Sequence, residues 1–164
     1  MSTPLAKFER RFADLLDHLG DLDVAALLDA LEDRSIEPDE TPIVQGEPHD
    51  SMLFVEWGAL VVEVDGVQVK TLDPGDVVGE VGLLSPGNAT ATVRAVKTTL
   101  LHVLSADALE RLWRDHPEVA STLLQGITRV ISERIRSIEG NVDLDEDDEN
   151  GFLSRLRALF GRAA

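Results

Sequence analysis

Hydrophobic residues recur at helical spacing in the first thirty residues of the chain. Apolar residues at intervals of three and four lie on one face of an α-helix, and a glycine between two such sets interrupts it. The pattern therefore predicts two short helices over residues 5–32, separated near Gly20. The apolar positions are Leu5, Phe8, Phe12, Leu15, Leu16 and Leu19, followed by Leu22, Leu27, Leu28 and Leu31.

From residue 35 to residue 104 the pattern changes to short runs rich in β-branched residues, which favour strands. Turn residues separate the runs, among them Asp65-Gly66 and the Pro-Gly pairs at 74–75 and 86–87. Many short strands at this spacing predict a β-sandwich or a small barrel. The predicted strands cover residues 41–44, 52–57, 59–64, 67–72, 91–96 and 98–104.

Helical periodicity returns after the strands, first over residues 106–114 and then from Pro117 to about Glu139. Proline suits the first turn of a helix, where an N–H group would lack a partner. The second helix carries a stripe with spacings of 3, 4, 4 and 3 residues, formed by Leu124, Ile127, Ile131, Ile135 and Ile138. A mean spacing of about 3.5 residues is typical of a coiled-coil seam. The stripe therefore predicts a homodimer, and packing on the chain's own barrel is the alternative.

The C-terminal part of the chain divides into two segments of opposite charge. Residues 141–150 hold six carboxylates and no base, which predicts an extended, solvated linker. Residues 151–164 hold three arginines and no acid, and their apolar residues share one face of a predicted amphipathic helix. This helix is too short to span a bilayer, so we expect it to dock on a protein partner, on an anionic membrane surface or on its own domain. Its predicted docking residues are Phe152, Leu153, Arg155, Leu156, Leu159 and Phe160.

Composition narrows the classes of function. Thirty-one acidic residues against fifteen basic ones give a net charge of −16, so the chain should repel nucleic acid. The absence of cysteine excludes disulfides, thiol nucleophiles and thiolate metal sites. No apolar stretch approaches the about 20 residues that span a bilayer, and the first residues lack the apolar core of a secretion signal. We therefore expect a cytoplasmic protein.

Three stretches of the barrel region carry candidate binding chemistry. Gly79 precedes a predicted short helix, so free backbone N–H groups near Val81, Gly82 and Leu83 would converge on one point and favour an anion. Gly79 and Gly82 also allow a ligand to approach the backbone closely. The stretches are residues 45–50 (Gln-Gly-Glu-Pro-His-Asp), residues 72–80 (Leu-Asp-Pro-Gly-Asp-Val-Val-Gly-Glu), and residues 81–84 (Val-Gly-Leu-Leu) with the strand that follows at 91–93.

These stretches, together with the order of the predicted elements, resemble the cyclic nucleotide-binding domain of catabolite-activator-type regulators, protein kinase A regulatory subunits and nucleotide-gated channels. The resemblance covers about residues 15–139. It implies an α+β, mainly β fold: a double-stranded β-helix, or jelly-roll-like barrel, over about 35–104, with N-terminal helices and two closing helices over 105–139. The predicted domain is thus 1–140, followed by the linker 141–150 and the tail 151–164.

The resemblance also implies roles for individual residues. Residues 72–84 are called the cassette below. In the family the glutamate after the cassette glycine, here Gly79, accepts a hydrogen bond from the ribose 2′-hydroxyl, and Glu80 stands at that position. A purely structural charge at the helix end is the alternative. The family then has Pro-Arg-Ser-Ala-Thr, whose arginine clamps the cyclic phosphate. Here residues 88–92 read Asn-Ala-Thr-Ala-Thr, so Ala89 replaces the arginine and Thr90 follows it. Arg94 is a candidate replacement: strand alternation places it on the same face as Thr90 and Thr92, and a structural role is the alternative that we favour.

No arrangement of residues predicts an enzyme, a metal site or a resident cofactor. The histidines are far apart, and the acidic linker lacks the glycine and glutamate of a calcium loop. Residues 140–164 are too few, and too acidic at their start, for the DNA-binding domain that follows this fold in transcription factors. We therefore expect a non-catalytic regulatory or adaptor module with weak or no cyclic-nucleotide binding. The alternative is a cyclic-nucleotide sensor that uses Glu80 and the cassette amides. Trp57 and Trp113 are predicted to pack in the core.

Overall fold

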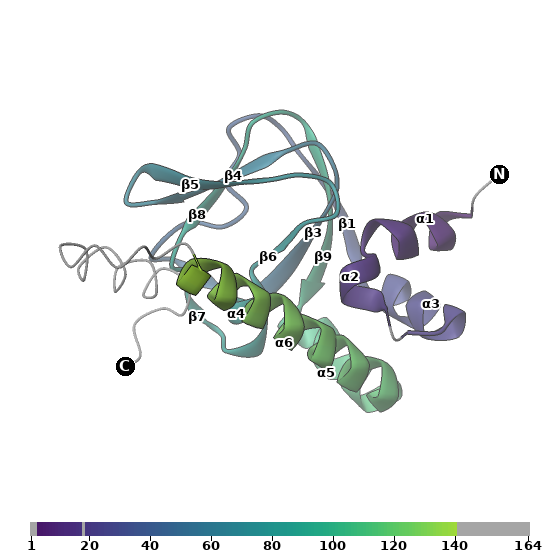
Figure 1. The fold of residues 1–164 in the computed structure, drawn as a ribbon. Helices are drawn as coiled ribbons and strands as arrows, with labels where there is room; N and C mark the ends of the chain where they lie inside the picture. Colours follow the sequence, from purple (N-terminus) through teal and green to yellow (C-terminus); the bar gives the residue numbers. More distant parts are fainter. Residues whose placement is uncertain (1–2, 18, 141–164) are drawn as a thin grey trace.

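Nine strands and six helices make up the described part of the chain, residues 3–17 and 19–140 of a computed structural model (Figure 1). The helices are α1 (Pro4–Arg11), α2 (Ala13–Leu16), α3 (Asp21–Ala30), α4 (Glu80–Leu84), α5 (Ala106–Asp115) and α6 (Pro117–Gly140). The strands are β1 (Glu32–Ile36), β2 (Pro48–His49), β3 (Ser51–Trp57), β4 (Leu60–Val64), β5 (Val67–Leu72), β6 (Val77–Val78), β7 (Gly87–Asn88), β8 (Thr92–Ala95) and β9 (Thr99–Ser105).

The strands form two antiparallel sheets that pack against each other as a jelly-roll-like barrel. One sheet has the order β1-β9-β3-β6, the other has the order β5-β4-β8, and β2 pairs with β7 in a short separate ladder. Alternate side chains from both sheets point inward because successive residues of a strand face opposite sides. The predicted α+β, mainly β fold is confirmed. The shared barrel core is formed by Ile36, Ile43, Leu53, Val55, Leu60, Leu72, Val93, Ala95 and Leu101.

The structure differs from the predicted elements where a segment has little apolar pattern of its own. β1 lies at the edge of its sheet, and four of its five residues are exposed, so the sequence there shows no alternation. The predicted strand at 41–44 is wrong: Ile43 makes only an isolated bridge to Val93. The predicted first helix is divided in two at Phe12, whose φ of −113° and ψ of 32° leave the helical range.

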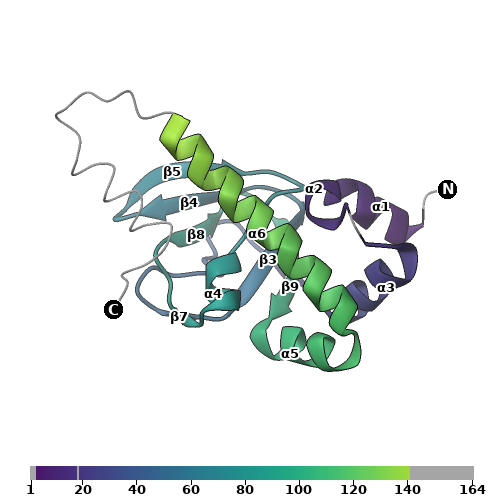
Figure 2. The same cartoon turned by 60° about the horizontal axis from the view of Figure 1, so that its bottom comes forward.

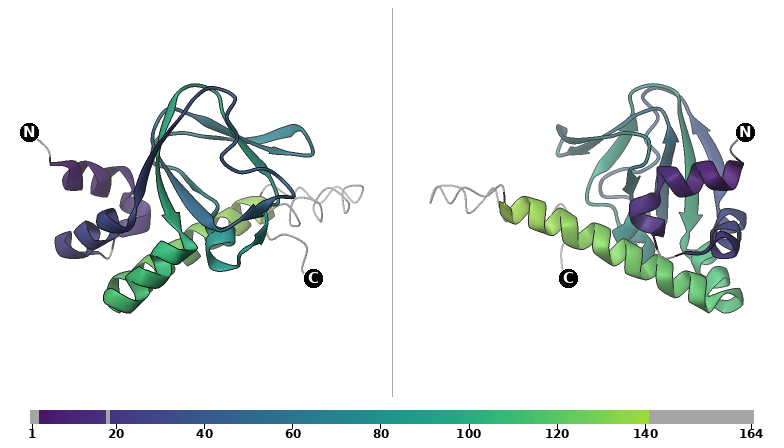
Figure 3. Two further views of the ribbon diagram at one scale, coloured as in Figure 1. Left: turned by 180° about the vertical axis from the view of Figure 1, so that it is seen from behind. Right: turned by 45° about the vertical axis from the view of Figure 1, so that its right-hand side comes forward.

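A second apolar core joins the helices to the outer face of the first sheet. It includes Phe8 of α1, Phe54 of β3 and Ile127 of α6, all buried. Figures 2 and 3 show α6 running along one side of the barrel, with the N-terminal helices beside its first half. α2 lies close to α6 at Gly126, where an added Cβ would collide with the backbone carbonyl of Leu15. Glycine is therefore required at this crossing.

The stripe predicted as a dimer seam begins inside the chain's own core. Ile127 is fully buried, and Leu124 and Ile131 pack against the same cluster. Ile135 is half-buried and lies outside that cluster, and the side chain of Ile138 is outside the described residues. The first part of the stripe thus packs within the chain, which was the alternative to a dimer seam. A homodimer formed through the end of α6 stays a prediction.

Both tryptophans are largely exposed, so the prediction that they pack in the core is wrong. Trp57 is 56% exposed and Trp113 is 50% exposed. The register of β3 against β9 shifts between Val55 and Trp57, which breaks the alternation and turns Trp57 outward. The ammonium of Lys97 lies over its ring, 5.6 Å from the centroid.

The predicted linker at 141–150 and the predicted docking residues of the tail lie outside the described residues. Within the described part, no helix is both long enough and apolar enough to cross a membrane.

Candidate functional site

The short helix α4 is seated against β2 and β3 through two glycines. Gly79 caps α4 with a φ of 85°, the left-handed region that side chains with a Cβ rarely adopt. An added Cβ there would collide with the carbonyl of Ser51 and the ring of His49. At Gly82 an added Cβ would again meet His49. These contacts explain why the segment from Gly79 to Leu83 contains two glycines.

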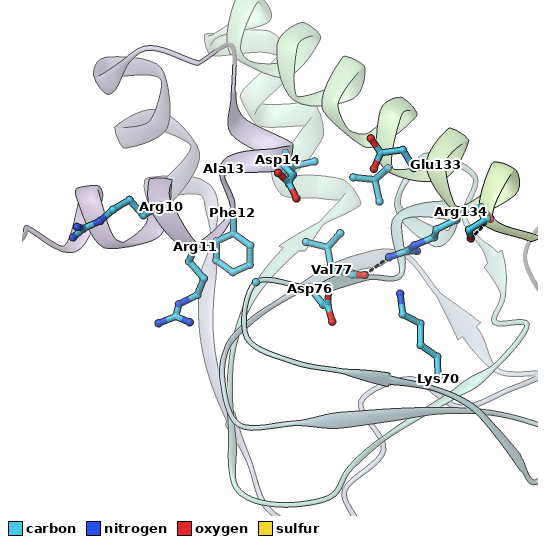
Figure 4. A pocket seen from close by; sticks show the side chains of 14 residues that line it. Arg10, Arg11, Phe12, Ala13, Asp14, Lys70, Asp76, Val77, Glu133 and Arg134 are labelled. Carbon is cyan, nitrogen blue, oxygen red and sulfur yellow. Dashed lines mark hydrogen bonds between the residues drawn. The ribbon is translucent and has the colours of Figure 1, made fainter.

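Glu80, the first residue of α4, is only 4% exposed. Its Oε1 accepts a hydrogen bond from Nη1 of Arg134, which reaches across from α6. The second oxygen, Oε2, is buried and has no hydrogen-bond partner among the described residues. Nη2 of Arg134 donates to the backbone carbonyl of Val77 in β6, as Figure 4 shows. One side chain of α6 thus connects both the helix and the strand of the cassette.

His49 lies partly buried beneath the cassette. One of its ring nitrogens contacts the carbonyl of Ser51. Burial lowers the pKa of the His49 imidazole, while the Ser51 carbonyl and the charge of Asp50 act in the opposite direction. The neutral ring is therefore the form that suits this position.

An open cleft of about 380 Å³ lies beside Arg134, between the α1–α2 junction, the turn before β6, and α6. Lys70 of β5 enters it from the barrel, and Figure 4 shows the Lys70 ammonium and the Arg134 guanidinium pointing toward one another. Burial lowers the pKa of Lys70, and the positive charge of Arg134 lowers it further, opposed by Asp76. Burial also lowers the pKa of Arg134, again opposed by Asp76.

The position of the expected phosphate clamp holds no cationic side chain. Ala89 packs against the barrel core. Its N–H donates to the carbonyl of Glu47 at 2.7 Å, and its carbonyl accepts from Gly46 at 2.8 Å. The backbone amide at this point is therefore already engaged. Thr90, the next residue, is half-buried.

Arg94 makes structural contacts on the surface of the second sheet. Its guanidinium pairs with Glu63 at 2.7 Å and with Asp39 at 3.1 Å. The hydrogen bond to Glu63 is the largest of the contributions that raise the pKa of Arg94. Any rescue of the clamp by Arg94 would have to break both contacts.

The structure brings the predicted residues Gly79, Glu80, Val81, Gly82 and Leu83 together in and before α4. The prediction of a free N–H group at Leu83 is wrong, because this group donates to the carbonyl of Gly79 at 3.1 Å. Ala89 and Thr90 follow β7, which pairs with β2.

Sequence reasoning missed two charged residues at this site, Arg134 and Lys70, and it included His49 only as part of the stretch at 45–50. Three arginines occupy the second half of α6, and no local pattern distinguishes Arg134 from Arg129 or Arg136. Among residues 3–17 and 19–140, no three His, Asp or Glu side chains are arranged to hold a metal ion.

Three comparisons with known proteins bear on this site. The family model described as "Cyclic nucleotide-binding domain" matches residues 33–116. A putative potassium channel protein of Rhodopseudomonas palustris is 30% identical over 142 residues, which are 82% of this chain and 34% of the channel. A cAMP-dependent protein kinase regulatory subunit of Yarrowia lipolytica is 36% identical over 100 residues, 60% of this chain and 27% of the subunit. The chain thus spans about a third of these two relatives or less.

Among solved structures, a cyclic nucleotide-binding domain from Methylobacillus flagellatus has a similar fold. The TM-score is 0.75 at 20% sequence identity, and the alignment covers 84% of this chain and 83% of the other. At this identity the similarity concerns the fold.

Proposed function

Because the chain belongs to the cyclic nucleotide-binding domain family, we propose that it is a non-catalytic regulatory module in which a ligand must compete with Arg134 for Glu80. Ordinary cyclic nucleotides then bind weakly or not at all. The family itself supports a regulatory or sensor role. The contact between Arg134 and Glu80 is the observation that carries the finer proposal.

The first argument is that the ribose acceptor already has a cationic partner. A guanidinium gives the Glu80 carboxylate a positive charge as well as a hydrogen bond, whereas a ribose hydroxyl is neutral. A ribose hydroxyl must therefore displace a charged donor when it binds Glu80. Because Arg134 belongs to α6, its release would free the end of this helix from the cassette. Occupancy of the pocket is thereby coupled to the position of α6.

The second argument is the missing clamp. At Ala89 there is no cation for a cyclic phosphate, and the backbone N–H is bonded to Glu47. Losing one partner of a buried charge pair costs about 2 to 5 kcal/mol. Since each 1.4 kcal/mol is about tenfold in affinity, the expected loss is roughly thirtyfold to several thousandfold relative to a clamped pocket.

A second candidate function is a genuine cyclic-nucleotide sensor, and one observation favours it. Oε2 of Glu80 is buried without a hydrogen-bond partner among the described residues. Buried polar atoms are usually satisfied, so an unpaired carboxylate oxygen suits a donor supplied by a ligand. A ribose hydroxyl is such a donor. In the sensor, the remaining contacts to the nucleotide would come from backbone N–H groups of the cassette.

Calorimetric titration with cyclic AMP and cyclic GMP distinguishes the two candidates. We expect no submillimolar binding to the wild-type chain and a clear gain in the Ala89→Arg variant. Adding Glu80→Gln to that variant should abolish the gain, because the ribose loses its charged acceptor. Submillimolar binding to the wild type would select the sensor instead. A folded Ala89→Arg variant with no gain would contradict the alignment of Ala89 with the clamp.

The output of the module is proposed to pass through α6 to the segments that follow it. The end of α6 would pair with a second copy, and the tail at 151–164 would bind a protein partner or, as the alternative, a membrane surface. The acidic linker at 141–150 would provide the reach. We propose the cytoplasm as the location, and no nucleic-acid partner, since the net charge is −16.

A further inference from the structure

Two cationic side chains face each other in the cleft of a strongly acidic protein. Lys70 and Arg134 come from β5 and α6 and point toward one another (Figure 4). They lie close enough for the charge of Arg134 to lower the pKa of Lys70. Two like charges held together repel each other, and an anion placed between them removes that repulsion. Such a pair is therefore a candidate anion site.

The other charged groups of the cleft leave this pair only partly compensated. Arg134 is paired with Glu80, and Asp76 acts on both cations through its charge while its carboxylate accepts the N–H of Asp73. Lys70 makes no ion pair with any residue of the described ranges. The remaining charged groups that line the cleft are Arg10, Arg11, Asp14 and Glu133.

Those remaining groups do not neutralise Lys70. Arg11 is paired with Glu56 at 3.2 Å, and Figure 4 shows Arg10 and Arg11 directed away from the pair. Asp14 and Glu133 lie on the helices on the far side of the cleft from Lys70 in the same view. The uncompensated positive charge is thus located at Lys70 and at the neighbouring face of Arg134.

We propose that Lys70 and Arg134 form a phosphate subsite that replaces the missing clamp at Ala89, so that the pocket takes a phosphorylated riboside with its phosphate directed toward α6. The proposal rests on the proposed function, in which Glu80 holds the ribose. On binding, Glu80 exchanges the guanidinium for a ribose hydroxyl, and Arg134 exchanges Glu80 for the phosphate beside Lys70. After the exchange Arg134 pairs with the phosphate and Glu80 accepts the ribose hydroxyl, so neither side chain is left without a hydrogen-bond partner.

The cleft has room for the phosphate end of this ligand, and Glu80, which is outside its lining, contacts the lining residue Arg134. Its volume of about 380 Å³ lies within the range of roughly 300 to 1,000 Å³ usual for small-molecule sites. Apolar side chains complete the lining, among them Phe12, Val77 and Val130. A cyclic phosphate and an open 5′-phosphate share the chemistry that the two cations recognise, and the experiment separates them.

The test compares three probes on the full chain by NMR titration up to millimolar concentrations: cyclic AMP, 5′-AMP and adenosine, which has no phosphate. The variants are Lys70→Ala, the conservative Lys70→Arg, and the matched control Lys97→Ala. In the wild type the ammonium of Lys97 lies over the ring of Trp57. Lys70→Ala should weaken at least one phosphorylated probe about tenfold or more, because one charge-assisted hydrogen bond is lost, and should leave adenosine unchanged. Lys70→Arg and Lys97→Ala should bind like the wild type.

Failure of the subsite and failure of the proposed function give different results. If Glu80→Gln weakens all three probes but Lys70→Ala weakens none, the subsite is overturned and the Glu80 pocket stands. If no probe binds the wild type, the subsite is overturned, and the module acts without a nucleotide. If binding is unaffected by Glu80→Gln, both proposals fall. In the Ala89→Arg variant the new arginine can bind the phosphate of a cyclic nucleotide, so the binding of that nucleotide should no longer depend on Lys70. Continued dependence on Lys70 would contradict the proposal that Lys70 and Arg134 replace the missing clamp.

Discussion

Removal of Arg134 should destabilise the fold because it leaves Glu80 buried without its charge partner. In the Arg134→Ala variant, Oε1 loses the only hydrogen bond that it makes with described residues, and Oε2 has none to begin with. Breaking a buried ion pair from one side costs about 3 to 5 kcal/mol. The Arg134 side chain is 23% exposed, so water from the cleft can reach the vacated position. We therefore expect a loss near the lower limit, about 3 kcal/mol.

That loss is large enough to measure in two ways. For a chain of this length, 1 kcal/mol shifts the thermal midpoint by about 2 to 4 °C, so the midpoint should fall by about 6 to 12 °C. Urea denaturation followed by circular dichroism should show the same loss as a lower midpoint concentration at unchanged slope. Arg136→Ala provides the matched control, since Arg136 is exposed on the same helix, and should change stability by less than about 0.5 kcal/mol.

A double-mutant cycle identifies the interaction responsible. Glu80→Gln removes the charge that Arg134 compensates, so combining it with Arg134→Ala should cost less than the sum of the two single changes. The coupling expected for groups in direct contact is about 1 to 3 kcal/mol. Additive effects, or an Arg134→Ala variant as stable as the Arg136→Ala control, would show that the pair does not hold α6 against the cassette.

Three further predictions concern other parts of the molecule. Gly126→Ala should lose about 1 kcal/mol of stability in urea denaturation, because pushing α2 away at the Leu15 carbonyl outweighs the gain in helix propensity. The wild type should lose stability between pH 7.5 and 5.5, and His49→Gln should reduce this loss. Burial holds the pKa of His49 below 6.5, so the unfolded state takes up a proton at a higher pH than the folded state. The stability present above pH 6.5 therefore falls as the pH decreases. Ile135→Asp should convert a homodimer into monomers in light scattering, because a charge at the end of α6 opposes apolar pairing.

Controls and contrary outcomes are available for each. Thr128→Ala, on an exposed position of the same helix, reports the propensity gain without the collision. A Gly126→Ala variant as stable as this control would contradict the close crossing. A His49→Gln variant that keeps the wild-type pH slope would remove His49 as the cause. A wild-type monomer at high micromolar concentration would contradict pairing through the end of α6.

The sequence by itself determined the features that depend on a few neighbouring residues. The cassette is one of them: Gly79 takes a left-handed conformation that glycine allows, and Glu80 begins the short helix that follows. The alanine at 89, where the resemblance places an arginine, was also readable from the sequence, as were the long central strands with their alternating apolar residues. These signals are local because backbone preference and side-chain periodicity act within a turn or a strand.

Only the tertiary structure decided which distant side chains meet. Arg134 reaches Glu80 from 54 positions along the chain, and its neighbour Lys70 comes from a third element. A single shift in strand register turns Trp57 out of the core, and Ile127 is intramolecular because α6 lies against the N-terminal helices. The physical reason is that the path of the chain and the packing of its layers bring these residues together, and sequence spacing carries no information about that path. The local sequence thus specified the cassette, whereas long-range packing determined which charged side chains meet beside it.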